Sequence, residues 1–225
     1  MTSSGFTPLT RRQLLRASIA LGSLTLCGPI TAAQAQTPLK RTPEQVLGPF
    51  YPVLRTVDRA ADLTTFPGKP GRAQGQMIYL MGRVLNPRGE PVSGAKVDIW
   101  QANTYGRYIH PSDTNPAPLD PNFEGHGVQL TDAEGRFRFK TIKPGAYPTG
   151  DGDWIRPPHI HFDVTGQINR LVTQMYFEGD PLNEKDQIRQ GVRCKDCLTT
   201  KLMPATKDVE PDSLIAVWDI VLRRG

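Results

Sequence analysis

Cysteine and histidine are scarce in this sequence of 225 residues, which contains 3 cysteines and 4 histidines. Cys194 and Cys197 form a lone C-x-x-C pair, and two cysteines alone cannot make a four-cysteine zinc site. No strand–helix–strand pattern surrounds the pair, which argues against a thioredoxin-like redox role. In an oxidising compartment the pair could close a small disulfide loop.

A long hydrophobic run is also missing, because the apolar stretch at residues 17–30 is shorter than the ~20 residues of a membrane span. It follows the twin arginines Arg11 and Arg12 and precedes the small residues Ala33 and Ala35. A basic start, an apolar middle and an A-x-A end are the layout of an export signal. We therefore expect residues 1–35 to be cleaved and the remaining chain to be periplasmic or otherwise exported, without a membrane anchor.

Excess positive charge is largely confined to that signal. Its removal takes away Arg11, Arg12 and Arg16 and no acid, which lowers the formal charge from +5 to +2. No run of lysine or arginine remains, and this disfavours nucleic acid as a partner despite the high pI. Because the twin-arginine route exports proteins that have already folded, the pattern also agrees with a metal captured before export.

The rest of the sequence predicts an all-β protein. Residues 36–75 are irregular and rich in proline and glycine, as expected of an extended N-terminal arm. Short runs of alternating polarity then follow between turn residues, which is typical of an antiparallel β-sandwich, here a single domain of residues 76–225. The predicted strands are Met77–Val84, Ala95–Trp100, Arg136–Phe139, His159–Val164, Leu171–Phe177 and Leu214–Leu222, with one short helix at Glu184–Gln190.

Two long segments, residues 101–127 and 141–158, interrupt the predicted strands. Loops of this length inside a compact domain are usually functional. The first contains Tyr105 and Tyr108, and the second contains Tyr147 and leads into His159. We expect these loops and the strand after them to form a metal site.

Two of the four histidines, His159 and His161, lie two residues apart in a predicted strand. Side chains on a strand repeat every second residue, so both imidazoles point to one face. Two imidazoles on one face are half of a metal site, although ordinary hydrogen bonds in a half-buried strand explain them equally well. His110 and His126 are not expected to be ligands.

Further ligands have to come from residues other than cysteine, and the long loops offer tyrosines. A phenolate is a hard anionic oxygen donor, and it suits a trivalent metal such as Fe(III) better than zinc. The pKa of a free tyrosine is about 10, so the metal must displace the phenolic proton near neutral pH.

Five ordered motifs give the sequence a specific likeness. They are WQANTYGRY at residues 100–108, LDPNF at 119–123, TIKPGAYP at 141–148, RPPHIHF at 156–162 and TQMYFEGDP at 173–181. Together they resemble the intradiol ring-cleavage dioxygenases, most closely the iron-bearing β subunits of the protocatechuate 3,4-dioxygenases. The resemblance covers residues 77–181 and the segment WDIVLR at 218–223.

That resemblance implies a non-haem Fe(III) held by four protein ligands, which are Tyr108, Tyr147, His159 and His161. Tyr147 would be the ligand that the substrate displaces, and it would accept a catechol proton as it leaves. Arg156 would stabilise negative charge on the ring, and Gln174 would help to orient the substrate. The implied reaction uses O2 to cleave a protocatechuate-like catechol between its two hydroxyl groups, which yields a cis,cis-muconate.

The resemblance also implies an oligomer, because the family's β subunits pair with a related α subunit that helps to form the substrate site. A homo-oligomer is equally compatible with the sequence. The chain lacks the helical dimerisation segment expected of the catechol and hydroxyquinol dioxygenases. Thr149 stands two residues after Tyr147, where the family often has tryptophan, and this leaves the ring substituent of the substrate open.

Two other hypotheses compete with this one. The segments at residues 82–84, 89–95 and 132–139 also resemble transthyretin-like modules, so the chain could be an exported, non-catalytic β-sandwich that binds carbohydrate or protein. That likeness explains the strands but not four aligned tyrosines and histidines. A zinc hydrolase would keep the site with another metal, but no Glu or Asp lies at a convincing general-base position beside His159 and His161.

Overall fold

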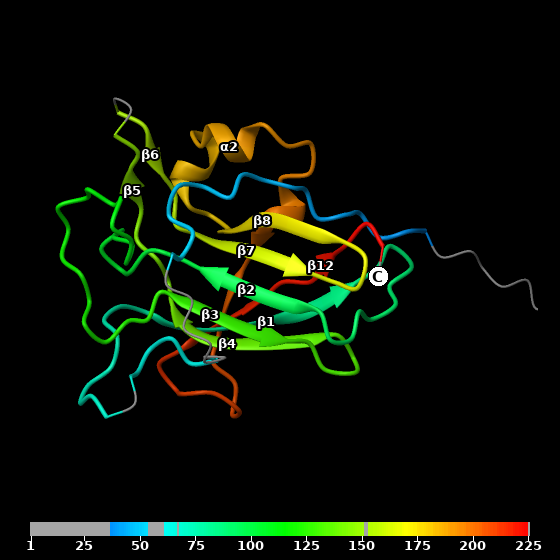
Figure 1. Ribbon diagram of the computed structural model, residues 1–225, viewed down its shortest axis with the longest axis horizontal. Helices are drawn as coiled ribbons and strands as arrows, with labels where there is room; N and C mark the ends of the chain where they lie inside the picture. The colour runs from blue at the N-terminus through cyan, green and yellow to red at the C-terminus, as the bar shows by residue number, and fades with distance from the viewer. Residues whose placement is uncertain (1–36, 54–60, 67, 151–152, 225) are drawn as a thin grey trace, which may run out of the picture. The chain divides into compact units, whose positions relative to one another are not determined.

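Two five-stranded sheets form a β-sandwich in the computed structural model (Figure 1). The structure describes residues 37–224 apart from 54–60, 67 and 151–152. The predicted export signal, residues 1–35, lies outside the described residues. Residues 37–53 contain no regular secondary structure, and we call them the N-terminal arm from here on.

The first sheet is built around its longest strand, β1 (Met77–Leu85). β4 (Arg136–Ile142) pairs with one edge of β1 in antiparallel orientation. β11 (Leu214–Val217) and β12 (Ile220–Val221) both pair with β1 in parallel orientation, and β10 (Leu202–Pro204) completes the sheet beside β11.

The second sheet carries the segments that the sequence marks as functional. Its order is β3 (His126–Leu130), β2 (Lys96–Trp100), β7 (His159–Thr165), β8 (Arg170–Phe177) and β9 (Thr199–Thr200). A two-stranded hairpin, β5 (Tyr147–Pro148) and β6 (Ile155–Arg156), precedes β7. The helical pieces among the described residues are the 3-10 turns η1 (Pro181–Glu184) and η2 (Asp196–Leu198) and the single α turn α2 (Gln187–Gln190).

The all-β prediction is confirmed, and the structure adds parallel pairs to the antiparallel pattern. Parallel ladders join β1 to β11, β1 to β12 and β8 to β9. The predicted strand Leu214–Leu222 is interrupted at Trp218, whose carbonyl oxygen passes over Gly82 of β1. A Cβ atom at Gly82 would lie 1.9 Å from that oxygen, so only glycine permits the crossing. The predicted helix Glu184–Gln190 is instead the end of η1 followed by α2.

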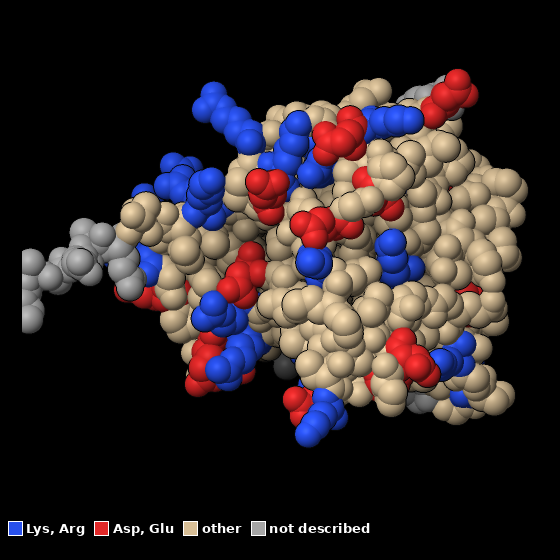
Figure 2. All heavy atoms as spheres, turned by 180° about the vertical axis from the view of Figure 1, so that it is seen from behind, with Lys and Arg blue, Asp and Glu red and all other residues tan. Residues whose placement is uncertain are grey.

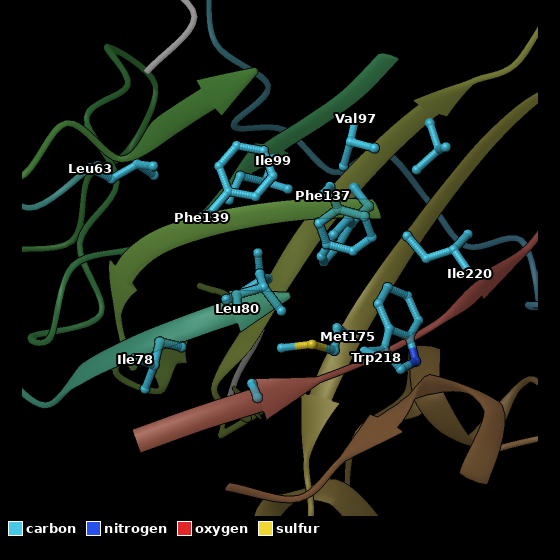
Figure 3. Close-up of a cluster of buried hydrophobic side chains, with 14 of the residues drawn as sticks. Leu63, Ile78, Leu80, Val97, Ile99, Phe137, Phe139, Met175, Trp218 and Ile220 are labelled. Carbon is cyan, nitrogen blue, oxygen red and sulfur yellow. The ribbon is translucent and has the colours of Figure 1, made fainter. Parts of the chain in front are cut away.

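The hydrophobic core fills the space between the two sheets (Figure 3). Inward-facing side chains alternate along the strands, as with Ile78 and Leu80 on β1 and Ile160 and Phe162 on β7. At ~25 cal/mol per Å² of apolar surface removed from water, this layer is the main stabilising contribution to the fold. It leaves the outer face of the second sheet available for a site.

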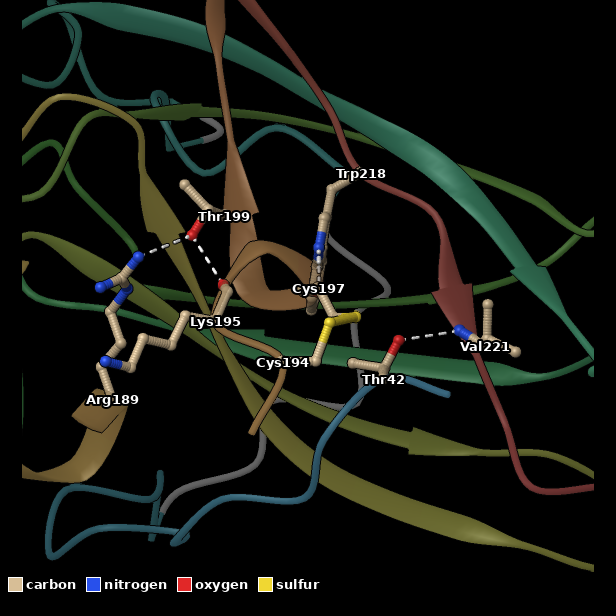
Figure 4. The surroundings of a disulfide bond; sticks show 8 residues. All are labelled: Thr42, Arg189, Cys194, Lys195, Cys197, Thr199, Trp218 and Val221. Atoms are coloured by element: carbon tan, nitrogen blue, oxygen red, sulfur yellow. Dashed lines mark hydrogen bonds between the residues drawn. A yellow bond between two sulfur atoms is a disulfide. The ribbon is translucent and has the colours of Figure 1, made fainter. Parts of the chain in front are cut away.

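A disulfide between Cys194 and Cys197 closes the loop that contains η2 (Figure 4). The Trp218 indole donates a hydrogen bond to the Cys197 carbonyl oxygen at 3.1 Å. Because Trp218 lies between β11 and β12, this bond attaches the disulfide loop to the first sheet. Thr42 of the N-terminal arm accepts a hydrogen bond from the Val221 backbone N–H at 2.9 Å. The structure therefore contains the disulfide between Cys194 and Cys197, which the sequence alone left open.

Basic and acidic side chains are interspersed over the face seen in Figure 2. Among the described residues, no helix has the length and apolar character needed to cross a membrane.

Candidate metal centre

Strand β7 is buried along almost its entire length, with six of its seven residues buried. Ile160, Phe162 and Val164 face the core, so His159, His161 and Asp163 must face outward by the strand alternation. The outward residues are buried because the N-terminal arm and the long loops cover this side of the sheet. Two imidazoles under such a cover are removed from water, which is unusual for histidine unless each finds a partner.

The two histidines converge as the strand spacing predicts. Their Nε2 atoms lie 3.1 Å apart, and each side chain is 2% exposed. His159 Nδ1 lies 2.7 Å from the Pro157 carbonyl oxygen, so the ring proton belongs on Nδ1 and the Nε2 lone pair points to the centre. His161 stacks on Trp100 with ring centroids 4.8 Å apart.

Both candidate tyrosines reach the same centre from different loops. The Tyr147 hydroxyl lies 3.4 Å from His159 Nε2. The Tyr108 ring lies edge-on to Tyr147 at 5.3 Å and 6.2 Å from the His161 ring, centroid to centroid. The Tyr108 hydroxyl is buried and makes no hydrogen bond of normal geometry to the described residues. Tyr105, by contrast, is exposed.

Asn103 organises the loop that carries Tyr108. Its side-chain oxygen accepts hydrogen bonds from the backbone N–H groups of Tyr105 and Arg107 at 2.9 and 3.0 Å. Its carbonyl oxygen accepts from Gly106 and from Gly145, which belongs to the Tyr147 loop. One asparagine therefore fixes the register between the two tyrosine loops.

Gly106 lets those two loops touch backbone to backbone. It has a φ of +80°, and a Cβ atom there would lie 2.2 Å from the Ala146 carbonyl oxygen. Glycine is the residue that tolerates both conditions.

We expect Gly106→Ala to lower the free energy of unfolding by about 3 kcal/mol, from the left-handed backbone and from overpacking. Gly94→Ala is the matched control, because Gly94 has a φ of +70° and a Cβ atom there would have no neighbour within 4 Å. It should cost only about 1 kcal/mol. Denaturant unfolding of both variants measures the difference, and equal losses would contradict the close contact between the loops.

The protonation states at the centre suit a metal. Burial lowers the pKa of His159 and His161 well below its usual range, and the charge of Arg156 lowers it further. Both imidazoles are therefore neutral, as metal ligation requires. Burial raises the pKa of Tyr108 and Tyr147 above its usual value, so both phenols keep their protons unless a cation displaces them.

Two neutral imidazoles and two phenols make a donor set for a hard, strongly Lewis-acidic cation. No group of three or more His, Cys, Asp or Glu lies together in the described part of the chain. A search for ligands of those types alone would miss this centre, because half of its donors are phenols.

Arg156 lies beside the centre in a buried polar network. Its Nε donates to Asp186 at 2.7 Å, and its Nη2 donates to Gln174 at 2.6 Å and to the Tyr176 hydroxyl at 3.1 Å. Burial alone would lower the pKa of Arg156, but Tyr147, Tyr176 and Asp186 raise it above its ordinary value. The guanidinium is therefore a permanent charge held in one orientation.

A cavity of about 220 Å³ adjoins Tyr147 and Arg156. The N-terminal arm forms one wall with Val46, Gly48 and Phe50, and Thr149, Trp154 and Ile188 are among the residues that line the rest. This volume is smaller than the pockets that hold drug-sized ligands, so it suits a molecule of one ring. A larger cavity of about 560 Å³ also touches Phe50 and Tyr108, but Tyr147 and Arg156 do not line it, and His159 and His161 line neither cavity.

Comparison with known proteins decides the family. The dioxygenase family model matches residues 46–224. The chain belongs to the intradiol ring-cleavage dioxygenases. The match includes the Tyr108, Tyr147 and His159 segments together with the arm from Val46 onward. The transthyretin-like hypothesis accounted for strands alone, whereas the family match extends over the loops that carry the centre.

Named relatives of this dioxygenase act on several catechols. This chain is 46% identical to the protocatechuate 3,4-dioxygenase beta chain of Burkholderia cepacia over 192 residues, which cover 83% of this chain and 81% of the relative. It is 33% identical to catechol 1,2-dioxygenase 1 of Acinetobacter lwoffii over 154 residues, covering 63% of this chain and 48% of the relative. The dioxygenase thus spans only about half the length of that relative.

A solved structure shares the fold along its whole length. It is the dioxygenase domain of a dioxygenase–carbohydrate-binding protein fusion from Streptomyces sp. SirexAA-E, with a TM-score of 0.61 and 27% identity. The likeness covers 83% of this dioxygenase and 100% of that domain.

Sequence reasoning missed several residues of the dioxygenase's site. Asp186 and Tyr176 hold Arg156, and Gly48 lies so close that a Cβ atom there would be 3.2 Å from His161 Cε1. Phe50 lies against Tyr108 with ring centroids 4.7 Å apart. No local signal marked these residues, and Asp186 lay inside the predicted helix Glu184–Gln190, whereas in the structure it is the N-cap of α2.

Proposed function

We propose that this dioxygenase binds a non-haem Fe(III) through Tyr108, Tyr147, His159 and His161 and cleaves a protocatechuate-like catechol. The observation that carries the proposal is the convergence of these four donors beside Arg156 and a one-ring cavity. The substrate belongs in the 220 Å³ cavity rather than the larger one, because Tyr147 and Arg156 line only the smaller.

When bound, Fe(III) would supply a Lewis acid that receives the two adjacent oxygens of the catechol and gives the ring reactivity toward O2. The protein's contribution is to prepare the charges around it. His159 and His161 offer neutral nitrogens, and Tyr108 and Tyr147 offer phenolates once their protons are displaced. Two phenolates would reduce the net positive charge of the trivalent ion.

Tyr147 is suited to accept a proton from the substrate. It lies on the cavity wall, whereas Tyr108 does not line that cavity. The Tyr147 oxygen could therefore give up its place to a catechol oxygen and take the catechol proton, while Tyr108 stays in place. Burial raises the pKa of Tyr147, which favours the protonated phenol after this exchange.

Arg156 and Gln174 would act on the negative charge that develops on the ring. Arg156 lines the cavity, and its orientation is fixed before the substrate arrives. A fixed cation beside a developing charge lowers the barrier without reorganisation. Gln174 is held from the other side, because its amide donates to the Val46 carbonyl oxygen at 3.0 Å.

Turnover and product analysis test the proposal. The purified chain, loaded with iron, should consume one O2 for each catechol and release a muconate cleaved between the two hydroxyl-bearing carbons. Comparing protocatechuate, catechol and hydroxyquinol then ranks the ring substituents. If the iron-loaded protein cleaves none of these three compounds, the proposed function is overturned.

We also propose that the chain is exported by the twin-arginine route. The disulfide between Cys194 and Cys197 supports this, because such bonds persist in oxidising compartments. Changing both Arg11 and Arg12 to Lys should leave the full-length chain in the cytoplasm of a bacterial host, where fractionation and immunoblotting detect it. Export of this variant at the unchanged level would contradict the route.

We propose that the enzyme works as an oligomer of identical chains or with a related subunit. The name of the 46% identical relative, a beta chain, supports assembly with another subunit. The arm of the same chain, however, already supplies one wall of the cavity. The mass and activity of the chain purified alone distinguish the two arrangements.

A further inference from the structure

The Arg156 guanidinium has one nitrogen left for a ligand. Nε is used by Asp186, and Nη2 is shared by Gln174 and the Tyr176 hydroxyl. Nη1 has no hydrogen-bond partner among the described residues, and Arg156 lines the cavity. The orientation of that nitrogen therefore depends on the groups that hold the other two.

Asp186 makes the ionic part of this hold. Its Oδ2 accepts from Arg156 Nε at 2.7 Å, and the carboxylate is completely buried. A buried carboxylate paired with a guanidinium forms a strong and directional hydrogen bond. Nε also has a fixed relation to the rest of the planar group, so fixing it sets the direction of Nη1.

The same carboxylate fixes part of the cavity wall. Asp186 Oδ1 accepts from the Arg189 backbone N–H at 2.9 Å, which makes Asp186 the N-cap of α2. α2 carries Ile188, which lines the cavity, and the Ile188 carbonyl oxygen accepts from Gln45 of the arm at 3.3 Å. Asp186 thus joins Arg156 to a part of the wall that α2 supplies.

We propose that Asp186 is a positioning residue of the ring-cleavage reaction. By holding Arg156 Nε, Asp186 directs Arg156 Nη1 toward the substrate. By capping α2, it also keeps Ile188 in place on the cavity wall. Asp186 does not line the cavity, so it acts through Arg156 rather than on the substrate. The inference rests on the proposed function, because Arg156 has a substrate to act on only if the chain cleaves a catechol.

The test begins with Asp186→Asn in the iron-loaded enzyme. The amide keeps the size of the side chain, but its single oxygen cannot serve both Arg156 and the Arg189 N–H. We expect kcat to fall by about 10- to 100-fold, as misplacement of a catalytic group does. KM should change less than kcat, because Asp186 itself does not line the cavity, and the iron-to-tyrosinate absorption should change little, because the metal ligands are not changed. Glu184→Gln is the matched control, since Glu184 pairs with Arg189 of the same turn but not with Arg156.

A double-mutant cycle separates positioning from a purely structural role. If Asp186 acts through Arg156, then adding Asp186→Asn to Arg156→Gln should lower kcat by less than about twofold, because the group to be positioned is gone. Two additive losses would overturn the proposal, and so would an unchanged kcat in Asp186→Asn. If the unchanged enzyme cleaves no catechol at all, it is the proposed function that fails instead.

Discussion

Replacing His161 with Gln should abolish both iron binding and ring cleavage. The His161 Nε2 atom lies 3.1 Å from the His159 Nε2 atom, and both histidines are buried, so the variant loses one of the two imidazole donors of the centre. Removing a group that merely orients a ligand typically costs 10- to 100-fold in metal affinity or activity. Loss of the ligand itself should exceed that range. Iron content by elemental analysis and kcat/KM on the best catechol measure the two effects.

His126→Gln is the control for this variant. His126 lies on the neighbouring part of the same sheet, opposite Trp100 on β3, but it bonds to Asp98 at 2.8 Å instead of the centre. It should bind a full complement of iron and remain active. Full iron content and colour in the His161 variant would show that the centre lies elsewhere.

Arg156→Gln should lower kcat by about 100- to 1,000-fold while iron stays bound. This is the usual effect of removing a preorganised group that stabilises developing charge. The variant also leaves the Asp186 carboxylate buried without its cation, and such a loss typically costs about 3–5 kcal/mol of stability. Single-turnover kinetics, iron analysis and thermal unfolding together separate the catalytic effect from the structural one.

Arg170→Gln provides the matched comparison. Arg170 pairs with the buried Asp163 through two hydrogen bonds of 2.9 Å on the same outer face of the sheet, but its side chain is 57% exposed and does not line the cavity. Its removal should leave kcat nearly unchanged. If the two arginine variants are equally active, Arg156 has no role in the chemistry.

Local patterns in the sequence predicted much of the sandwich. β1, β2, β7 and β8 have clear alternation and turn residues at their ends, and each lies where it was expected within a few residues. β3, β5, β6, β9 and β10 were not predicted, because each is defined by pairing with its neighbour rather than by a polarity pattern of its own. The parallel pairing of β11 and β12 with β1 depends on how distant segments meet, which no local pattern contains.

The candidate site could also be predicted from the sequence only in part. His159 and His161 share a face because of strand periodicity, and the family resemblance pointed to Tyr108, Tyr147, Arg156 and Gln174, all of which the structure brings to one place. The N-terminal arm, residues 37–53, is part of the segment 36–75 that was expected only as an extended arm. Its contribution to the cavity arises from tertiary contacts such as the Gln45 N–H to the Val172 carbonyl oxygen at 2.9 Å, which alternation and turn signals do not encode. The Asp186–Arg156 pair likewise joins distant segments, because Arg156 belongs to β6 and Asp186 is the N-cap of α2.

The visible absorption spectrum of the purified, iron-loaded protein, before and after anaerobic addition of protocatechuate, tests the central claim most directly. A phenolate bound to Fe(III) absorbs in the visible, so Tyr108 and Tyr147 should give a broad band that shifts to longer wavelength when the catechol binds. A protein that stays colourless after iron loading would contradict an Fe(III) centre built on these two tyrosines.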